Sequence, residues 1–190
     1  MPLLPLTRGL YAQVDEDDYQ RLKHLKWYAH FKNLRTAYAV RTATDPNVPK
    51  KYPLRYLHHD ILRLPLPLPP KTMVDHINRD PLDCRKANLR LCTPCQNSAN
   101  KGPQRSKNKT SKYKGVSSRN KSKAWLARFT YNKIYYELGI FPDEYSAVVA
   151  YNCAVTRTIG QFAYINHWTG PTNPPNAQPV PGRLLKPPRK

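Results

Sequence analysis

Apolar and polar residues alternate along the first part of the chain. Residues 10–14 place an apolar side chain at every second position, which predicts a strand, because successive strand side chains point to opposite faces. Two aromatic-rich runs, 27–31 and 36–41, flank a short polar segment and predict a β-hairpin. Residues 1–52 are therefore expected to form a β-rich opening part of the chain.

An acidic run interrupts this pattern. Asp15, Glu16, Asp17 and Asp18 are consecutive, and the helix dipole stabilises carboxylates at the N-terminus of a helix. The run therefore predicts the first turn of a short helix. Clustered carboxylates can also hold a metal ion, but their place at a helix start favours a solvated first turn.

The middle of the chain predicts two short strands and a helix. Strands are expected at 74–77 and 87–91, separated by a segment rich in turn-forming residues. Thr93 is suited to cap a helix that begins at Pro94 and ends near Gly102. The expected order is therefore strand, strand, helix.

The last third of the chain predicts a sheet covered by a helix. Residues 125–130 and 134–139 each alternate between apolar and polar positions, which indicates two strands. Small and apolar residues then recur at helical spacing, at Ala147, Ala150, Tyr151, Ala154 and Ile159. We expect three antiparallel strands packed on one helix, and an α+β fold for the chain as a whole.

The charge of the chain narrows the class of partner. Lys and Arg number 32 against 12 Asp and Glu, which gives a formal net charge of +20. Such an excess favours binding to a polyanion through phosphate neutralisation and counterion release. Nucleic acid is therefore the expected partner, and a structural RNA-binding protein is one reading that charge alone would allow.

No segment predicts export or membrane insertion. The first residues are broken by prolines, and no run approaches the roughly 20 apolar residues of a membrane helix. A cytoplasmic protein with reduced cysteines is expected. Cys92 and Cys95 have the spacing of half a zinc site, with Cys84 as a possible third ligand. No second pair follows, so ordinary thiols, Cys153 included, are favoured over structural zinc.

Three polar residues carry the candidate chemistry. Hydrolysis of a phosphodiester needs a base, and His76 can act as one because the pKa of histidine lies near neutrality. Asp75 and Asn97 offer oxygen ligands, which suit Mg²⁺ or Mn²⁺. Because neighbours on a strand point to opposite faces, Asp75 and His76 can share one site only if the backbone turns there.

The motif around these residues resembles that of the HNH endonucleases. The similarity is carried by residues 74–80, 83–90 and 96–100. More narrowly, these runs resemble phage- and intron-encoded homing endonucleases with a ββα-metal finger. The resemblance implies that His76 is the general base and that Asp75 and Asn97 hold the metal ion. It also implies that Asn88 hydrogen-bonds across the finger and orients the base.

Other residues near the motif have less certain roles. Cys84 departs from the family, which often has Asn there, and is not expected to touch the chemistry. Arg79 and Arg90 could clamp DNA phosphate through a bidentate fork or lie exposed on the finger. His58 and His59 could contact DNA, but support of the finger is favoured.

Residues 112–166 resemble the plant ethylene-response-factor type of DNA-binding domain. The similarity is carried by residues 113–116, 125–127, 138–141, 147–151 and 160–166. That family places its sheet in the DNA major groove, which implies by position these DNA-facing residues: Ser117, Arg119, Lys121, Arg128, Thr130, Tyr135 and Glu137. Ser117, Thr130 and Glu137 stand where plant domains have Arg or Trp, so the plant target sequence does not carry over. Glu137 could accept a hydrogen bond from cytosine N4 or repel phosphate.

The chain is thus expected to contain five segments. They are the β-rich N-terminal part of a nuclease module (1–52), the HNH ββα-metal finger (53–101), a basic linker (102–111), the DNA-binding domain (112–166) and a disordered Pro-rich tail (167–190).

Together these features predict a DNA endonuclease of homing type, encoded by a phage or mobile element. It would use Mg²⁺ or Mn²⁺ and nick double-stranded DNA as a monomer or weak dimer. The alternative is a sequence-specific DNA-binding regulator with a decayed nuclease finger. The intact set of Asp75, His76, Asn88 and Asn97 argues against decay.

Overall fold

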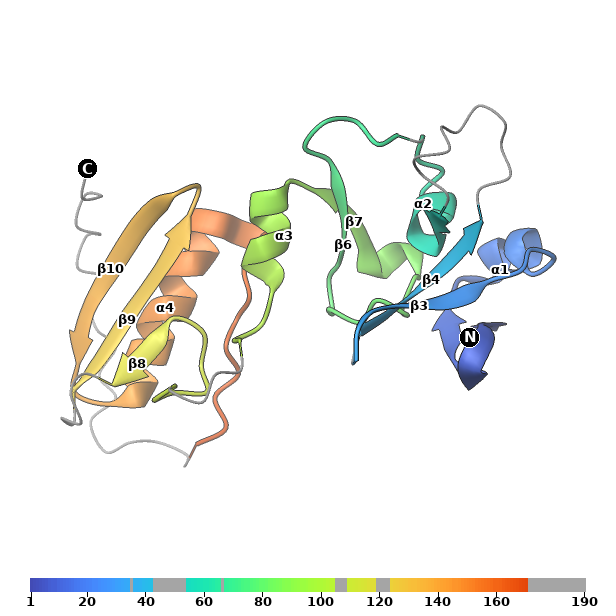
Figure 1. Cartoon of the computed structure of the whole chain (residues 1–190). Helices are drawn as coiled ribbons and strands as arrows, with labels where there is room; N and C mark the ends of the chain where they lie inside the picture. The colour runs from blue at the N-terminus through green and yellow to red at the C-terminus, as the bar shows by residue number, and fades with distance from the viewer. Residues whose placement is uncertain (35, 43–53, 66, 105–108, 119–123, 171–190) are drawn as a thin grey trace. The chain divides into compact units, whose positions relative to one another are not determined.

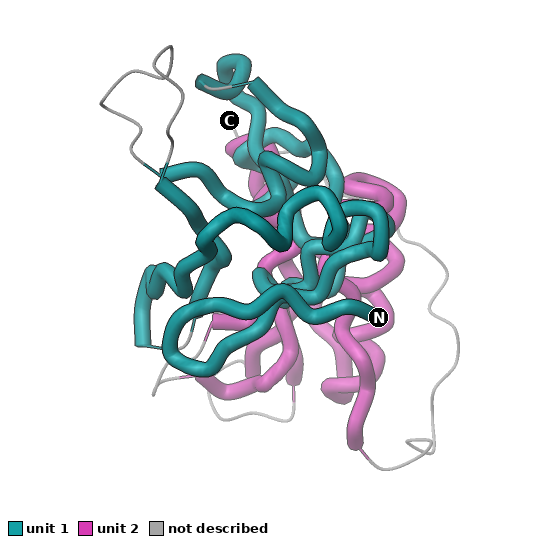
Figure 2. The backbone as a smooth tube through the Cα atoms, turned by 90° about the vertical axis from the view of Figure 1, so that its right-hand side faces the viewer, with its two compact units in different colours: residues 1–97 teal, residues 98–190 magenta. Residues whose placement is uncertain are grey.

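The chain divides into two units, residues 1–97 and 98–190, each described here by itself (Figure 2). A computed structural model describes residues 1–34, 36–42, 54–65, 67–104, 109–118 and 124–170. Among these residues, none of the helices has the length and apolar character needed to cross a membrane.

The first unit opens with short strands, as the alternation predicts. Its elements are β1 (Leu3–Pro5), η1 (Thr7–Gly9), β2 (Tyr11–Gln13), α1 (Glu16–Leu22), β3 (Tyr28–Asn33), β4 (Thr36–Thr42), β5 (Leu54–Tyr56) and α2 (Leu57–Ile61). Strands β1 and β2 pair with each other, and β3, β4 and β5 form an antiparallel sheet with β4 in the middle (Figure 1). The predicted hairpin is β3 and β4.

The acidic run starts α1, but it is not the solvated first turn that the sequence favours. Asp18 is only 1% exposed. Its carboxylate pairs with Arg21 at 2.5 Å and with Lys86 Nζ at 3.0 Å, while the exposed Asp17 also pairs with Lys86. The helix dipole explains where the acids lie in the sequence, and tertiary contacts then bury one of them. The run therefore fastens α1 to the segment before β7.

The predicted strand–strand–helix order is present as β6 (Met73–His76), β7 (Leu89–Cys92) and α3 (Pro94–Asn100), with the one-turn helix η2 (Lys86–Asn88) before β7. The two strands are antiparallel, and Asp75 lies opposite Arg90. Helix α3 begins as expected, because Thr93 and Gln96 form a reciprocal capping box. Thr93 N–H donates to Gln96 Oε1 at 2.8 Å, and Gln96 N–H donates to Thr93 Oγ1 at 3.3 Å.

The opening strands and the finger share one core. Leu4, Ala12, Trp27 and Leu57 are buried together with Leu89 of the finger. In addition, Gln13 N–H donates to the Leu82 carbonyl, and Cys84 N–H donates to the Gln13 carbonyl. The first 60 residues therefore hold the turn between β6 and β7 in place.

The second unit is a three-stranded antiparallel sheet packed on one helix, as predicted. Its elements are β8 (Val116–Ser118), β9 (Trp125–Tyr131), β10 (Ile134–Phe141), α4 (Glu144–Ile159) and η3 (Gly160–Phe162). Strand β9 lies between β8 and β10, and α4 runs across the three strands (Figure 1). Helix α4 starts at Asp143, whose side chain accepts from Ser146 N–H at 2.7 Å. The α+β fold is thus confirmed.

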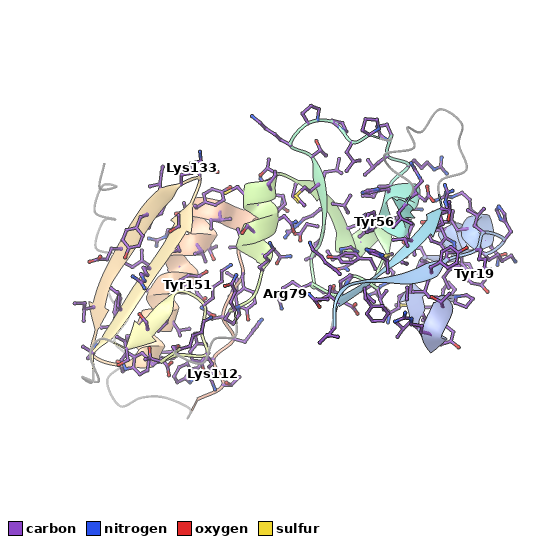
Figure 3. The ribbon with its side chains drawn as sticks, in the orientation of Figure 1. Tyr19, Tyr56, Arg79, Lys112, Lys133 and Tyr151 are labelled. Atoms are coloured by element: carbon purple, nitrogen blue, oxygen red, sulfur yellow. The ribbon has the colours of Figure 1, made fainter. Side chains whose placement is uncertain are left out.

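The core of this unit lies between the sheet and α4. Ala127 and Phe129 point from β9 toward Tyr151 and Val155 of the helix, and Figure 3 shows Tyr151 between the helix and the sheet. Gly115 must be glycine, because its φ is +74° and a Cβ would lie 2.2 Å from Tyr151 and 2.4 Å from the Arg128 carbonyl. Small residues here allow the close approach of helix and sheet.

Residues 167–170, which the sequence assigns to a disordered tail, are packed instead. The ring of Trp168 stacks on Tyr113 at 5.2 Å, and Thr169 N–H donates to the Tyr113 hydroxyl at 3.1 Å. Aromatic burial outweighs the low apolar content of this short stretch. The rest of the predicted tail, 171–190, lies outside the described residues.

Candidate active site

Asp75 is a buried carboxylate held by an arginine. It is 5% exposed, and Arg90 lies directly opposite on β7. Arg90 donates to Asp75 Oδ2 twice, from Nε at 2.8 Å and from Nη2 at 2.6 Å. The Arg90 side chain is itself only 13% exposed. The structure thus places Arg90 on a carboxylate, and this charge-assisted pair fixes where the oxygens of Asp75 lie.

Asn97 of α3 reaches the same face of β6 as Asp75. Its Nδ2 lies 3.7 Å from Sδ of Met73, which is two residues before Asp75. Residues i and i+2 of a strand share a face. The two predicted metal ligands, Asp75 and Asn97, therefore lie toward the same side of the hairpin.

His76 is the last residue of β6 and lies in an aromatic environment. It is 6% exposed. Its ring contacts His58 of α2, with centroids 5.1 Å apart, and Tyr38 of β4 at 6.3 Å. Burial lowers the pKa of His76, although the carboxylates of Asp75, Asp80 and Asp83 oppose the shift. A neutral imidazole, able to accept a proton, is therefore favoured near neutral pH.

The chain turns directly after His76. Arg79 N–H donates to the His76 carbonyl at 2.9 Å, and Arg79 has a left-handed φ of 70°. A turn thus follows β6 immediately, but Asp75 and His76 themselves are both still paired with β7, so the backbone does not turn between them. Figure 3 labels Arg79, whose side chain is exposed in this turn.

Asn88 closes this turn by bonding across the finger. Its Nδ2 donates to Asn78 Oδ1 at 2.9 Å and to the Asp83 carbonyl at 2.7 Å, while its Oδ1 accepts from Asn78 N–H at 2.9 Å. Asn78 in turn donates to Asp83 Oδ2 at 2.7 Å. Asn88 is 7% exposed, so these bonds replace water. The amide fixes the loop that follows the base.

Cys84 corrects one expectation. The sequence places it away from the chemistry, yet its Sγ lies 3.9 Å from Nε2 of His76, and the residue is 1% exposed. The thiol also donates to the Pro81 carbonyl at 3.6 Å. Burial raises the pKa of Cys84, with the nearby carboxylates of Asp83 and Asp80 adding to the shift. A neutral thiol therefore packs against the base.

The donor set fits a hard divalent cation. Asp75 supplies an acceptor-only carboxylate and Asn97 a half-buried amide oxygen, which are ligands that Mg²⁺ and Mn²⁺ accept. Zinc-type ligands are not gathered in the described part of the chain, where no group of three or more His, Cys, Asp or Glu could hold a metal ion. All four cysteines are free thiols.

The predicted DNA-facing residues of the second unit share one face of its sheet. Arg128 lies opposite Glu137, and Thr130 lies opposite Tyr135, while Ser117 is on the neighbouring strand. Their neighbours Ala127 and Phe129 are buried under α4, so the alternation turns the polar set away from the helix. Arg119 and Lys121 lie outside the described residues.

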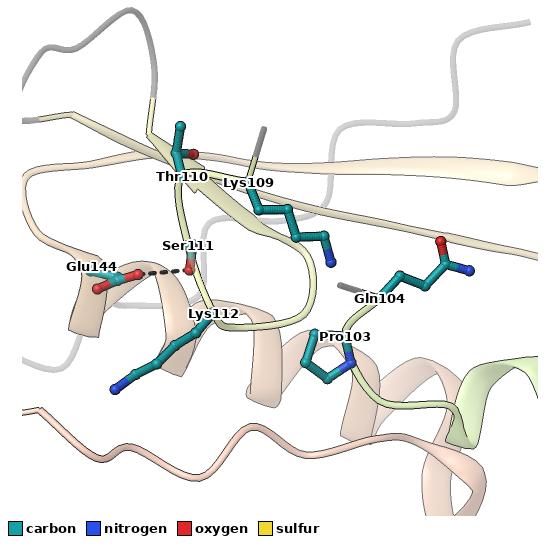
Figure 4. A pocket seen from close by; sticks show the side chains of 7 residues that line it. All are labelled: Pro103, Gln104, Lys109, Thr110, Ser111, Lys112 and Glu144. Atoms are coloured by element: carbon teal, nitrogen blue, oxygen red, sulfur yellow. Dashed lines mark hydrogen bonds between the residues drawn. The ribbon is translucent and has the colours of Figure 1, made fainter. Parts of the chain in front are cut away.

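A shallow hollow in the second unit does not contain a candidate base and metal ligands like those of the finger. It is lined by Pro103, Gln104, Lys109, Thr110, Ser111, Lys112 and Glu144. Within it, Ser111 Oγ donates to Glu144 Oε1 at 2.6 Å (Figure 4). The hydroxyl and the carboxylate thus satisfy each other, and the bond fastens the basic segment to the start of α4.

Comparison with known proteins agrees with this geometry. A protein of Acanthamoeba polyphaga mimivirus named as an uncharacterized HNH endonuclease is 30% identical over 168 residues, which cover 86% of this chain and 79% of the relative. The sequence pattern of the HNH endonuclease family matches residues 55–99, from β5 through α3. The chain belongs to the HNH endonucleases. No solved structure matches it.

Two neighbours of the predicted site were not expected from the sequence, Arg90 as the partner of Asp75 and Tyr38 as a neighbour of His76. For His58, support of the finger was expected, but its contact with His76 was not. The antiparallel pairing of 74–77 with 87–91 could have signalled the first, because it places Arg90 opposite Asp75. No local pattern signals the other two, which come from α2 and β4.

The buried histidines of the HNH unit predict acid sensitivity. Burial lowers the pKa of His59 to about 4, with the nearby Arg55 adding to the shift, and lowers that of His58 well below its usual range. Both rings therefore take up protons on unfolding, and their contribution to stability is present above pH ~6.5 and is lost as the pH falls toward ~4. We expect the melting temperature to fall over this window.

The decisive measurement compares the pH slopes of variants. His59→Phe should make the melting temperature less steeply dependent on pH between 6.5 and 4. His24→Phe, at an exposed histidine, should leave the slope unchanged. Equal slopes for wild type and His59→Phe would contradict the burial effect.

Proposed function

We propose that this protein is a metal-dependent DNA endonuclease of homing type. It hydrolyses phosphodiester bonds, nicking DNA at a site selected by its C-terminal unit. The observation that carries the proposal is the pair of adjacent buried residues at the end of β6. One is a carboxylate fixed by Arg90, and the next is a histidine whose ring packs against His58, Tyr38 and Cys84.

Each residue of the finger has a distinct role in this proposal. His76 accepts a proton from the attacking water. Asp75 and Asn97 hold Mg²⁺ or Mn²⁺, which when bound offsets the negative charge that develops on the phosphate. Asn88 fixes the turn after His76 and so orients the base. Asp75 and His76 are consecutive residues at the end of β6, and in this proposal the base and the metal ligand act on the same phosphate. The products carry 3′-hydroxyl and 5′-phosphate ends.

The substrate is double-stranded DNA. Arg79, exposed in the turn next to His76, contacts a phosphate near the cleaved bond. Arg90 holds Asp75, and its guanidinium contacts a DNA phosphate in this proposal. Ser117, Arg128, Thr130, Tyr135 and Glu137 contact DNA from the sheet of the second unit, and Arg119 and Lys121 also contact DNA. The net charge of +20 supports the binding of a polyanion.

One finger per chain fits the cleavage of one strand by a monomer. A double-strand cut then needs either a weak dimer or two successive nicking events by a monomer at the same site. The free thiols fit action in the reducing cytoplasm of a host cell. The mimiviral relative is in keeping with a gene carried by a virus or another mobile element.

A nicking assay tests this function directly. Supercoiled plasmid carrying the target, or a library of sites, is incubated with the protein in Mg²⁺, in Mn²⁺ and in excess EDTA. We expect open-circular DNA with either metal and none with EDTA. Binding without nicking would instead support the alternative, a DNA-binding regulator with a decayed finger. Preferential binding of structured RNA would support a structural RNA-binding protein.

The second unit predicts a separate effect on affinity. Arg128→Ala should weaken specific DNA binding by about 1–3 kcal/mol if its guanidinium reads a base, which corresponds to about 5- to 150-fold. The turnover number at saturating DNA should remain unchanged, because the finger is intact. Fluorescence anisotropy at several salt concentrations measures this, and Arg157→Ala, at an exposed position on α4, is the matched control. Equal losses for both variants would show that the sheet face has no special role.

A further inference from the structure

The imidazole of His76 is packed against a second histidine from a distant part of the chain. The ring of His58, in α2, lies with its centroid 5.1 Å from that of His76, and the two planes cross at 81°. The ring of Tyr38 lies 6.3 Å from each of them. Edge-to-face contacts at such distances restrict how a ring can rotate. The plane of His76 is thus bounded by His58 and Tyr38.

His58 is itself held rigidly. It stacks on Tyr56 at 5.2 Å with an interplanar angle of 19°, and it meets His59 edge-on at 4.6 Å. Helix α2 is anchored by Asp60, whose buried carboxylate accepts from Arg41 and Arg55. All five residues of α2 are buried. Movement of His58 would therefore require α2 to leave the core.

The surroundings of His58 favour a packing role. The residue is 7% exposed and its ring lies among the rings of Tyr38, Tyr56, His59 and His76, which favours support of the finger over the DNA contact considered from the sequence. Although His58, His59 and His76 are neighbours, they are not a metal-binding group of the described chain. Burial, followed by the neighbouring His59 and His76, lowers the pKa of His58 well below its usual range. A neutral ring is a packing partner for His76 that adds no charge beside it.

We propose that His58 is a positioning residue, whose ring fixes the orientation of the His76 imidazole for proton abstraction. The inference rests on the proposed role of His76 as the base. Catalytic groups must be held closely, since a displacement of about 1 Å can cost about 10²-fold in rate. His58 acts through His76 and does not touch the substrate.

Four variants test this role. His58→Ala removes the ring, His58→Leu keeps an apolar side chain without a flat ring, and His58→Phe keeps the flat ring without its nitrogens. Ile61→Ala is the matched control, because it removes a buried side chain from the same helix and leaves the rings of Tyr38, His58 and His76 in place. Each is assayed for kcat and KM of nicking, and for DNA affinity without metal.

We expect kcat to fall about tenfold or more in His58→Ala and His58→Leu, with KM and DNA affinity unchanged. His58→Phe should recover most of kcat, and Ile61→Ala should stay within about twofold of wild type. The ¹H–¹³C NMR signals of the His76 ring should shift and broaden in His58→Ala and His58→Leu but not in His58→Phe. If His58→Ala does not fold, the comparison of Leu with Phe carries the test.

Three results would overturn the proposal. One is an unchanged kcat in folded His58→Leu. Another is a loss in His58→Phe equal to that in His58→Leu, since the nitrogens would then matter rather than the ring. The third is a loss confined to KM. Failure of the proposed function is distinct, because a wild-type protein that does not nick still reports the ordering of the His76 ring by NMR.

Discussion

Replacement of His76 with alanine should abolish most of the nicking activity in Mg²⁺. A positioned general base contributes about 10²–10⁴-fold to a rate, and the neighbouring His58 lies on α2 rather than at the end of β6 beside Asp75. The rate of conversion of supercoiled to open-circular plasmid, measured under single-turnover conditions, gives the loss. DNA affinity should remain within about twofold of wild type, since phosphate-binding arginines set it.

The control for this experiment is His30→Ala, at an exposed histidine of β3. It should nick at the wild-type rate. The catalytic assignment is wrong if His76→Ala, shown to be folded by circular dichroism, nicks as fast as the wild type. A defect restored by added imidazole would support the base role further, because the cavity left by the side chain can admit the free base.

Replacement of Asp75 with asparagine should remove metal-dependent nicking and also lower stability. The change removes the carboxylate that holds the metal ion and leaves the guanidinium of Arg90, 13% exposed, without its charged partner. Removal of one member of a buried pair costs about 3–5 kcal/mol of unfolding free energy. Denaturant unfolding measures the stability, and nicking across a series of Mn²⁺ concentrations measures the loss of metal binding.

The two effects of Asp75→Asn are separated by a second change. The double variant Asp75→Asn/Arg90→Gln removes both charges, so it should regain part of the stability but none of the nicking. Asp17→Asn breaks an exposed pair with Lys86 and should cost at most about 1 kcal/mol. Nicking by the double variant at low metal concentration would show that Asp75 does not hold the ion.

The secondary structure of the finger was predicted well because its signals are local. Thr93 and Gln96 cap α3 from within one helical turn, and in the segment between β6 and β7 the side chains of Asn78 and Asp80 each accept from a backbone N–H two residues on. The same holds for α4, where Asp143 caps the first turn. The prediction of solvent exposure was wrong where folding buries a charged side chain. Asp18 was expected in water, but Lys86, 68 positions away, reaches it in the folded unit.

In the candidate site, too, some features follow from the sequence alone and others depend on tertiary contacts. The identities of the base, the ligands and the cross-finger amide follow from the spacing of Asp75, His76, Asn88 and Asn97 in the family motif, which is a property of the sequence. Cys84 shows the limit of that spacing. It was set aside because of its identity, yet its thiol packs 3.9 Å from the His76 ring. A motif states which residues are present and not what surrounds them.

By itself, then, the sequence determined the order of elements, the polyanion-binding charge and the residues of the finger, because periodicity, capping and charge act over a few residues. Only the tertiary structure decided how the site is supported. Burial of α2 against β4 and β6 brings His58 and Tyr38 to His76, and strand pairing brings Arg90 to Asp75. These contacts join segments up to 38 residues apart in the case of Tyr38 and His76, and only the packing of a shared hydrophobic core brings such segments together.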